Sequence, residues 1–199
     1  MASGMDLSRA ARLAWLAGLA VLVAAPFVGL YPVFMMKALC FAIFAMAFNL
    51  LLGFTGLLSF GHAAYLGSAA YVTGYLVRSA GCSPEVGILV GVALAAALGG
   101  VVGLIAIRRQ GIYFAMITLA LSQMVFFLCL QAPFTGGEDG IQAVPRGKLL
   151  GIVDLRDDRV MYAFVASVFL AAFYMIYRVV HSPFGQVLKA IRENEPRAV

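Results

Sequence analysis

The segment of residues 33–77 constrains the fold of this chain more than any other feature. It is almost wholly apolar and carries one charged residue, Lys37, near its start. A single helix of this length, rising about 1.5 Å per residue, would extend roughly 68 Å, while the apolar core of a bilayer is only about 30 Å thick. The segment must therefore break. Two glycines, Gly53 and Gly56, permit non-helical backbone and predict two elements, 33–52 and about 56–77.

Almost no polar loop lies between the two elements at this break, so the chain there is not expected to leave the membrane as a solvent-exposed loop. Non-helical backbone at membrane depth is tolerated only when it is buried in protein or lines a wet cavity. The stretch 53–62 is therefore either a tight hairpin or a broken, partly re-entrant segment. We favour the re-entrant form.

Four further segments have the length and composition of membrane spans. They are residues 13–31, 86–107, 111–131 and 160–180. In the whole chain 63% of residues are apolar and 12% are charged, which excludes a soluble globular enzyme. The net charge of +5 is spread singly and forms no basic face, so we expect no nucleic-acid partner. The prediction is one all-α, polytopic membrane domain over 1–199, with about six transmembrane helices in contact with membrane lipid.

The distribution of basic residues gives the chain a direction across the membrane. Arg108 and Arg109 occupy a very short loop, and Arg9 and Arg12 precede the first span. Basic residues in such positions favour the cytoplasmic side. We therefore expect both termini to be cytoplasmic and the long loop 132–159 to be external.

Few polar side chains lie within the predicted spans, and none is a deeply placed acid or arginine. This absence argues against a proton pump or an ion-coupled antiporter. No carboxylate pair or metal-ligand cluster is present either, so we predict no catalytic residue and no metal site. Ser59 and His62, one helical turn apart, either line a pathway or stabilise the break. The residues predicted to line a substrate pathway are Asn49, Thr55, Ser59, His62, Thr118, Ser122 and Gln123.

Small residues recur at every fourth position of the span 86–107. We call this set of residues the glycine stripe; it consists of Gly87, Gly91, Ala95, Gly99 and Gly103. Small residues let helix backbones approach closely in lipid. The stripe therefore serves either packing within this chain, which we favour, or a face between two subunits.

The segment 184–195 has the pattern of a short amphipathic helix. Its apolar residues recur at i, i+3, i+4 and i+7, and its other positions carry both signs of charge. A mixed charge suits a protein groove better than a lipid surface. The sequence predicts contact with a cytoplasmic protein through Phe184, Val187, Leu188, Ile191, Arg192, Glu193 and Glu195.

Four ordered motifs, from residue 33 to the end, resemble one protein family. They read Gly53-x-x-Gly56-x-x-Ser59-Phe60-Gly61-His62, Gly111-x-Tyr113-Phe114-Ala115-x-x-Thr118, Thr135-Gly136-Gly137-x-x-Gly140-Ile141 and Ser182-Pro183-Phe184-Gly185 with Ala190-Ile191-Arg192-Glu193. The chain is similar to the LivM-type membrane permease subunits of bacterial ABC importers for branched-chain amino acids.

The resemblance implies a permease of the bacterial inner membrane without chemistry or cofactor of its own. Such subunits pair with a second homologous permease subunit, two ATP-binding subunits and an extracytoplasmic substrate-binding protein. The chain has no G-x-x-x-x-G-K-[ST] motif, so ATP is expected to bind to the partners, with 184–195 as the coupling helix. Family members continue through several more helices, which implies that this chain is either truncated at its C-terminus, the product of a fragmentary gene, or one part of a split subunit. Alternatives are a permease for urea or small amides, and an ATP-independent secondary transporter or channel.

Overall fold

The computed structural model describes residues 18, 31–109, 111–149, 151 and 153–198. The first predicted span, 13–31, lies almost entirely outside the described residues. The described helices are α2 (Pro32–Asn49), η1 (Leu50–Thr55), α3 (His62–Arg78), α4 (Pro84–Ala106), α5 (Ile112–Gln131), η2 (Pro133–Thr135), η3 (Gly137–Asp139), α6 (Asp158–Val180) and α7 (Pro183–Ala198); the strands are β1 (Lys148–Leu149) and β2 (Val153–Asp154).

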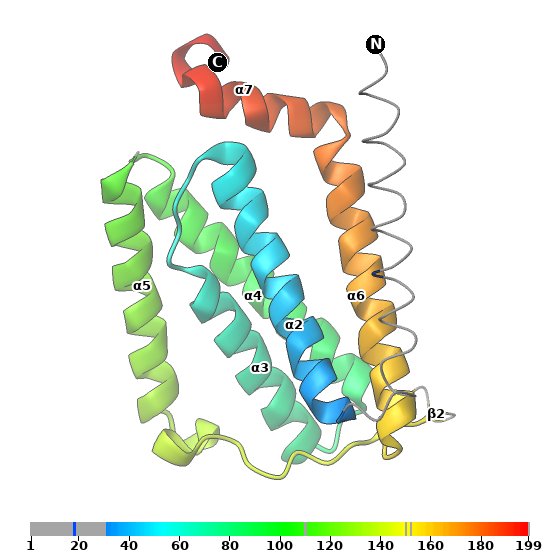
Figure 1. Ribbon diagram of the computed structural model, residues 1–199. Coiled ribbons are helices and arrows are strands. Elements are labelled where there is room, and N and C mark those ends of the chain that lie inside the picture. The colour runs from blue at the N-terminus through cyan, green and yellow to red at the C-terminus, as the bar shows by residue number, and fades with distance from the viewer. Residues whose placement is uncertain (1–17, 19–30, 110, 150, 152, 199) are drawn as a thin grey trace, which may run out of the picture.

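The predicted break lies where the glycines stand. Helix α2 continues as one π-helical segment, η1, and ends at Gly56, whose φ of 73° is left-handed. The next helix begins only at His62, and the chain between runs back alongside the bundle (Figure 1). The predicted break is thus found, and it is not a tight hairpin. The expected helix start at Gly56 was wrong by several residues, because a left-handed residue cannot continue a right-handed helix.

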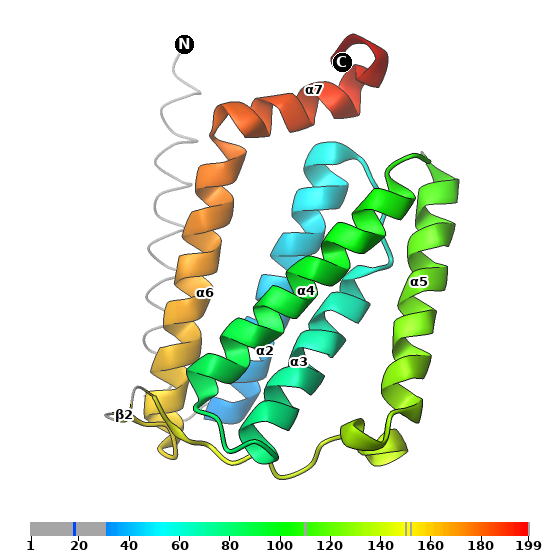
Figure 2. The ribbon, with the colours of Figure 1, turned by 180° about the vertical axis from the view of Figure 1, so that it is seen from behind.

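Helices α2 to α6 alternate in direction along the bundle, and α7 lies across one end of it (Figures 1 and 2). Four of them are long and apolar enough to cross a membrane: Pro32–Thr55, Pro84–Ala106, Ile112–Gln131 and Asp158–Val180. Helix α3 has 17 residues, or about 25 Å, and the extended stretch before it adds length at about 3.3 Å per residue. The turn between α4 and α5 and the helix α7 lie at the same end of the bundle.

The helices pack in two groups. Helix α2 packs on α6 through Met36, Leu39, Tyr162 and Ala166, all of which are buried. Helix α3 packs most extensively on α4, with α5 beside it. The broken segment between α2 and α3 links these two groups.

The glycine stripe of α4 divides into two halves. A Cβ on Gly91 would lie 2.9 Å from the carbonyl oxygen of Ala69 in α3, and one on Gly87 would lie 3.0 Å from Val77 Cγ2. Packing within the chain is thus confirmed for this half. A Cβ on Gly99 or Gly103 would meet no described atom within 4 Å.

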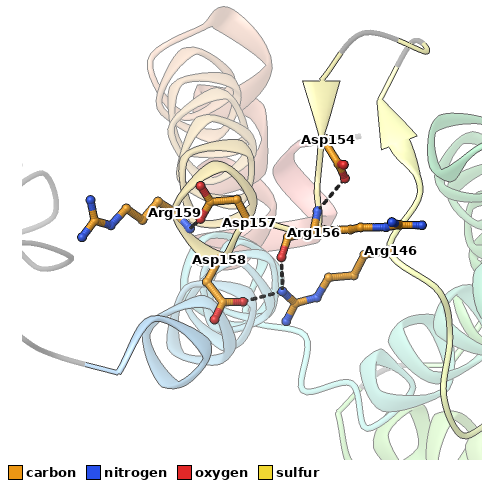
Figure 3. A network of polar contacts seen from close by, with 6 residues as sticks. All are labelled: Arg146, Asp154, Arg156, Asp157, Asp158 and Arg159. Carbon is orange, nitrogen blue, oxygen red and sulfur yellow. Dashed lines mark hydrogen bonds and ion pairs between the residues drawn. The ribbon is translucent and has the colours of Figure 1, made fainter.

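The loop between α5 and α6, which was predicted to be external, contains more order than the sequence indicated. Strands β1 and β2 form a two-residue antiparallel hairpin, and Leu155 behind it is only 2% exposed. Arg146 pairs with Asp158 in the first turn of α6, and Asp157 caps that helix by accepting from the backbone N–H of Arg159 at 3.0 Å (Figure 3). Short-range polar contacts of this kind hold the loop against the start of α6.

Candidate functional site

Polar side chains at the break form hydrogen bonds with backbone groups that are not paired within a helix. Thr118 Oγ1 on α5 accepts a hydrogen bond from the backbone N–H of Phe60 at 3.1 Å and donates to the carbonyl of Ala115 at 3.0 Å. Ser59 Oγ accepts from the N–H of Gly61 at 3.2 Å. Unpaired backbone groups are costly in an apolar environment, so these contacts stabilise the extended stretch. Both residues were predicted to line a pathway, and they also hold the break together.

Four of the predicted pathway residues surround one cavity of about 410 Å³. Thr55, Ser59, His62 and Thr118 all line it, and most of its other walls are aliphatic. Helices α2, α4, α5 and α7 contribute those walls, so the cavity lies at the junction of the two packing groups and beside α7.

The imidazole of His62 is held among aromatic rings. Phe48 and Tyr65 approach it edge-on, with ring centroids at 5.4 Å and 5.8 Å. Its Nδ1 atom is buried and has no hydrogen-bond partner among the described residues. A buried polar atom without a partner marks a place where a ligand atom or a water would be stabilised.

The remaining predicted pathway residues lie elsewhere. Ser122 and Gln123 line a second cavity of about 240 Å³ between α3 and α5. Asn49 is exposed and lines neither cavity; its Oδ1 stands 2.7 Å from where a Cβ on Gly53 would be. The structure therefore does not bring all seven residues together.

Helix α7 lies across the end of the bundle and contacts the break directly (Figure 1). Arg192 Nη1 donates a hydrogen bond to the carbonyl oxygen of Gly53 at 2.6 Å. Lys189 Nζ lies 5.7 Å from the centroid of the Phe54 ring. A cation near the last carbonyls of a helix is stabilised by their partial negative charge, so Arg192 joins α7 to the end of η1.

The predicted apolar face of α7 is divided between the bundle and the surface. Leu188 and Ile191 are half-buried, whereas Phe184 and Val187 are 60% and 49% exposed. Glu193 is exposed, and the side chain of Glu195 lies outside the described part. Phe184 and Leu188 also line the 410 Å³ cavity, which the sequence pattern gave no means of predicting.

The sharp turn from α6 into α7 depends on Gly185. A Cβ on this residue would lie 2.7 Å from the carbonyl oxygen of Val179 and would also meet that of Val180. Ser182 Oγ donates to the same Val179 carbonyl at 2.7 Å. The absence of a side chain at Gly185 thus lets the first turn of α7 approach the last carbonyls of α6 closely.

Among the lining residues that the sequence analysis did not assign to this site are Gly99 and Gly103. The only signal was the continuation of the glycine stripe beyond the part that packs on α3. A stripe in the sequence does not show where its helix partner ends.

The fold and the site define a multi-pass helical membrane protein in which an amphipathic helix, α7, contacts a break between two helices. The family model described as "Branched-chain amino acid transport system / permease component" matches residues 30–199. The chain belongs to this family.

Two curated relatives support the same assignment. The chain is 27% identical over 183 residues to the high-affinity branched-chain amino acid transport system permease protein LivM of Escherichia coli, covering 78% of this chain and 42% of the relative. It is 26% identical, with the same coverage, to the LivM protein of Salmonella typhimurium. This chain thus spans less than half the length of these relatives. No solved structure matches it.

Proposed function

We propose that this chain is a permease subunit of an ATP-driven ABC importer for branched-chain, hydrophobic amino acids in the bacterial inner membrane. ATP is bound and hydrolysed by partner subunits, a second homologous permease completes the membrane unit, and an extracytoplasmic binding protein delivers the substrate. Membership of the family and the similarity to the two LivM proteins support this proposal.

The observation that carries the coupling role is the contact of α7 with the helix break. One side of α7 presents exposed Phe184 and Val187, and another holds the Gly53 carbonyl through Arg192. A partner that moves α7 would therefore act directly on the backbone at the break. An energetic link of this kind is what ATP-driven transport needs, since a ligand shifts a conformational equilibrium only through differential contacts with the two states.

The orientation in this proposal places α7 and both termini in the cytoplasm. The turn carrying Arg108 and Arg109 lies at the same end of the bundle as α7, which agrees with the tendency of basic residues to remain inside. The external loop then contains Arg146 and its ion pair with Asp158, at the end where a binding protein would dock.

The coupling role is tested by a charge on the exposed side of α7. We expect Val187→Asp to lower the amount of ATP-binding subunit that co-purifies with the full chain by about tenfold or more, as for an apolar interface anchor. Gln186→Asp is the matched control, because it places the same charge at a neighbouring exposed position. Ile191 is less suitable, since it is half-buried and its replacement would also disturb the packing of α7.

The transport role is measured as uptake in membrane vesicles with and without ATP. We expect ATP-dependent uptake of leucine, isoleucine and valine. Uptake that continues at the same rate without ATP would support a secondary transporter or channel instead. Uptake of urea in preference to leucine would retain the permease assignment and overturn the substrate.

A further inference from the structure

The 410 Å³ cavity contains space that packing does not explain. Gly99 and Gly103 line it, and a Cβ on either would meet no described atom within 4 Å. In the other half of the stripe, a Cβ on Gly87 would lie 3.0 Å from Val77 Cγ2, and one on Gly91 would lie 2.9 Å from the carbonyl oxygen of Ala69. Close helix contact therefore accounts for the glycines of the first half, while those of the second half leave room.

The cavity combines aliphatic walls with one polar side-chain atom that has no partner among the described residues. Leu51, Val102 and Leu188 are among its apolar walls. The hydroxyl of Thr118 is already engaged with backbone groups, whereas His62 Nδ1 has no partner in the described part of the chain. Ligand sites typically combine such apolar walls with few polar groups in volumes of about 300–1,000 Å³.

One wall of the cavity belongs to the helix that the proposed ATPase partner would move. Phe184 and Leu188 of α7 line it, together with Leu57 of the extended stretch. The same helix is joined to the break by Arg192. A displacement of α7 would change the boundary of the cavity on its cytoplasmic side.

We propose that this cavity binds the substrate in transit: the branched aliphatic side chain occupies the space beside Gly99 and Gly103, the ammonium group donates to His62 Nδ1, and the carboxylate points to the open side of the cavity. Helix α7 closes the cytoplasmic side through Phe184 and Leu188. This inference rests on the proposed function and adds to it the residues that select substrate size.

The test fills the cavity from α4 and measures selectivity in the assembled transporter. Gly103→Ala should lower leucine uptake more than uptake of the smaller valine, and Gly103→Leu should lower leucine uptake by about tenfold or more, since a single methylene in an apolar site discriminates by such factors. Gly100→Leu is the matched control: it also has open space at its Cβ position, but it does not line the cavity, and we expect a change within about twofold.

A second variant pair addresses the polar group. Asn offers an acceptor oxygen near the position of Nδ1, so His62→Asn should retain most of the uptake that His62→Leu loses. Complex assembly, measured by co-purification of the ATP-binding subunit, should be unchanged in every variant.

The outcomes separate this inference from the proposed function. If the wild-type chain takes up no aliphatic amino acid, the proposed function fails. If it does, and the Gly103 variants leave both leucine uptake and the valine-to-leucine ratio unchanged, the cavity is not a transit site. Loss of assembly in Gly103→Leu but not in Gly100→Leu would show that protein fills this space, and would also overturn the inference.

Discussion

The contact between Arg192 and Gly53 gives the sharpest prediction about how α7 is held. Arg192→Ala removes the hydrogen bond to a carbonyl in the last turn of η1. The last carbonyls of a helix have no hydrogen-bond partner within the helix, and the Gly53 carbonyl is one of them. The substitution therefore removes this contact between α7 and η1 without changing how the chain connects them.

The size of the effect follows from the kind of contact. A hydrogen bond from a charged donor contributes about 1.5–3 kcal/mol, and a cation at a helix C-terminus about 0.3–1 kcal/mol. Because Arg192 is exposed, solvent screening reduces the total to about 1–2 kcal/mol. A free-energy change of this size raises the population in which α7 has left the break by a factor of about 5–30.

Hydrogen–deuterium exchange of the full chain in nanodiscs measures that population, because exchange of protected amides reports local opening. Amides in 186–193 should exchange about 5–30 times faster in Arg192→Ala. Arg192→Lys, which keeps the charge but not the forked donor, should be intermediate.

The control for this experiment is Arg109→Ala, which removes an exposed arginine at the same end of the bundle and should leave exchange in α7 unchanged. The reasoning is refuted if Arg192→Ala exchanges at the wild-type rate, or if Arg109→Ala accelerates exchange in α7 equally.

Two further substitutions test the close contacts of the site. Gly185→Ala should loosen the start of α7 by about 1–3 kcal/mol, because its Cβ would meet the carbonyl of Val180; faster exchange in α7 is the readout, and wild-type protection would contradict the contact. Thr118→Val should lower the thermal stability of the purified chain by an equivalent of about 1–3 kcal/mol, because it leaves the N–H of Phe60 without its acceptor. Thr118→Ser retains the hydroxyl and should remain close to wild type, so equal losses in both variants would argue against the hydrogen bond.

The break illustrates what local sequence can predict. The apolar length of 33–77 forced an interruption, and Gly53 and Gly56 gave its position. The sequence did not reveal that the next helix would begin only at His62, because the acceptor that holds Phe60 is Thr118, which is distant along the chain.

The polar residues of the predicted pathway show the same division. Residue type and depth selected Ser122 and Thr118 equally well, yet only Thr118 faces the larger cavity together with His62. Which cavity a helical residue faces depends on how α5 is rotated against α3 and α4, and the pattern of α5 is apolar on all sides.

The sequence alone determined the membrane class, the approximate spans and the amphipathic character of 184–195, because these depend on length, hydropathy and periodicity within one segment. The tertiary structure alone decided that Arg192 binds Gly53, that Gly99 and Gly103 border open space, and that α7 forms a wall of the cavity. These are relations between segments far apart in the chain. They depend on how the packed helices are positioned and rotated against one another. Similar apolar surfaces can pack in several ways, and only the assembled bundle fixes one of them.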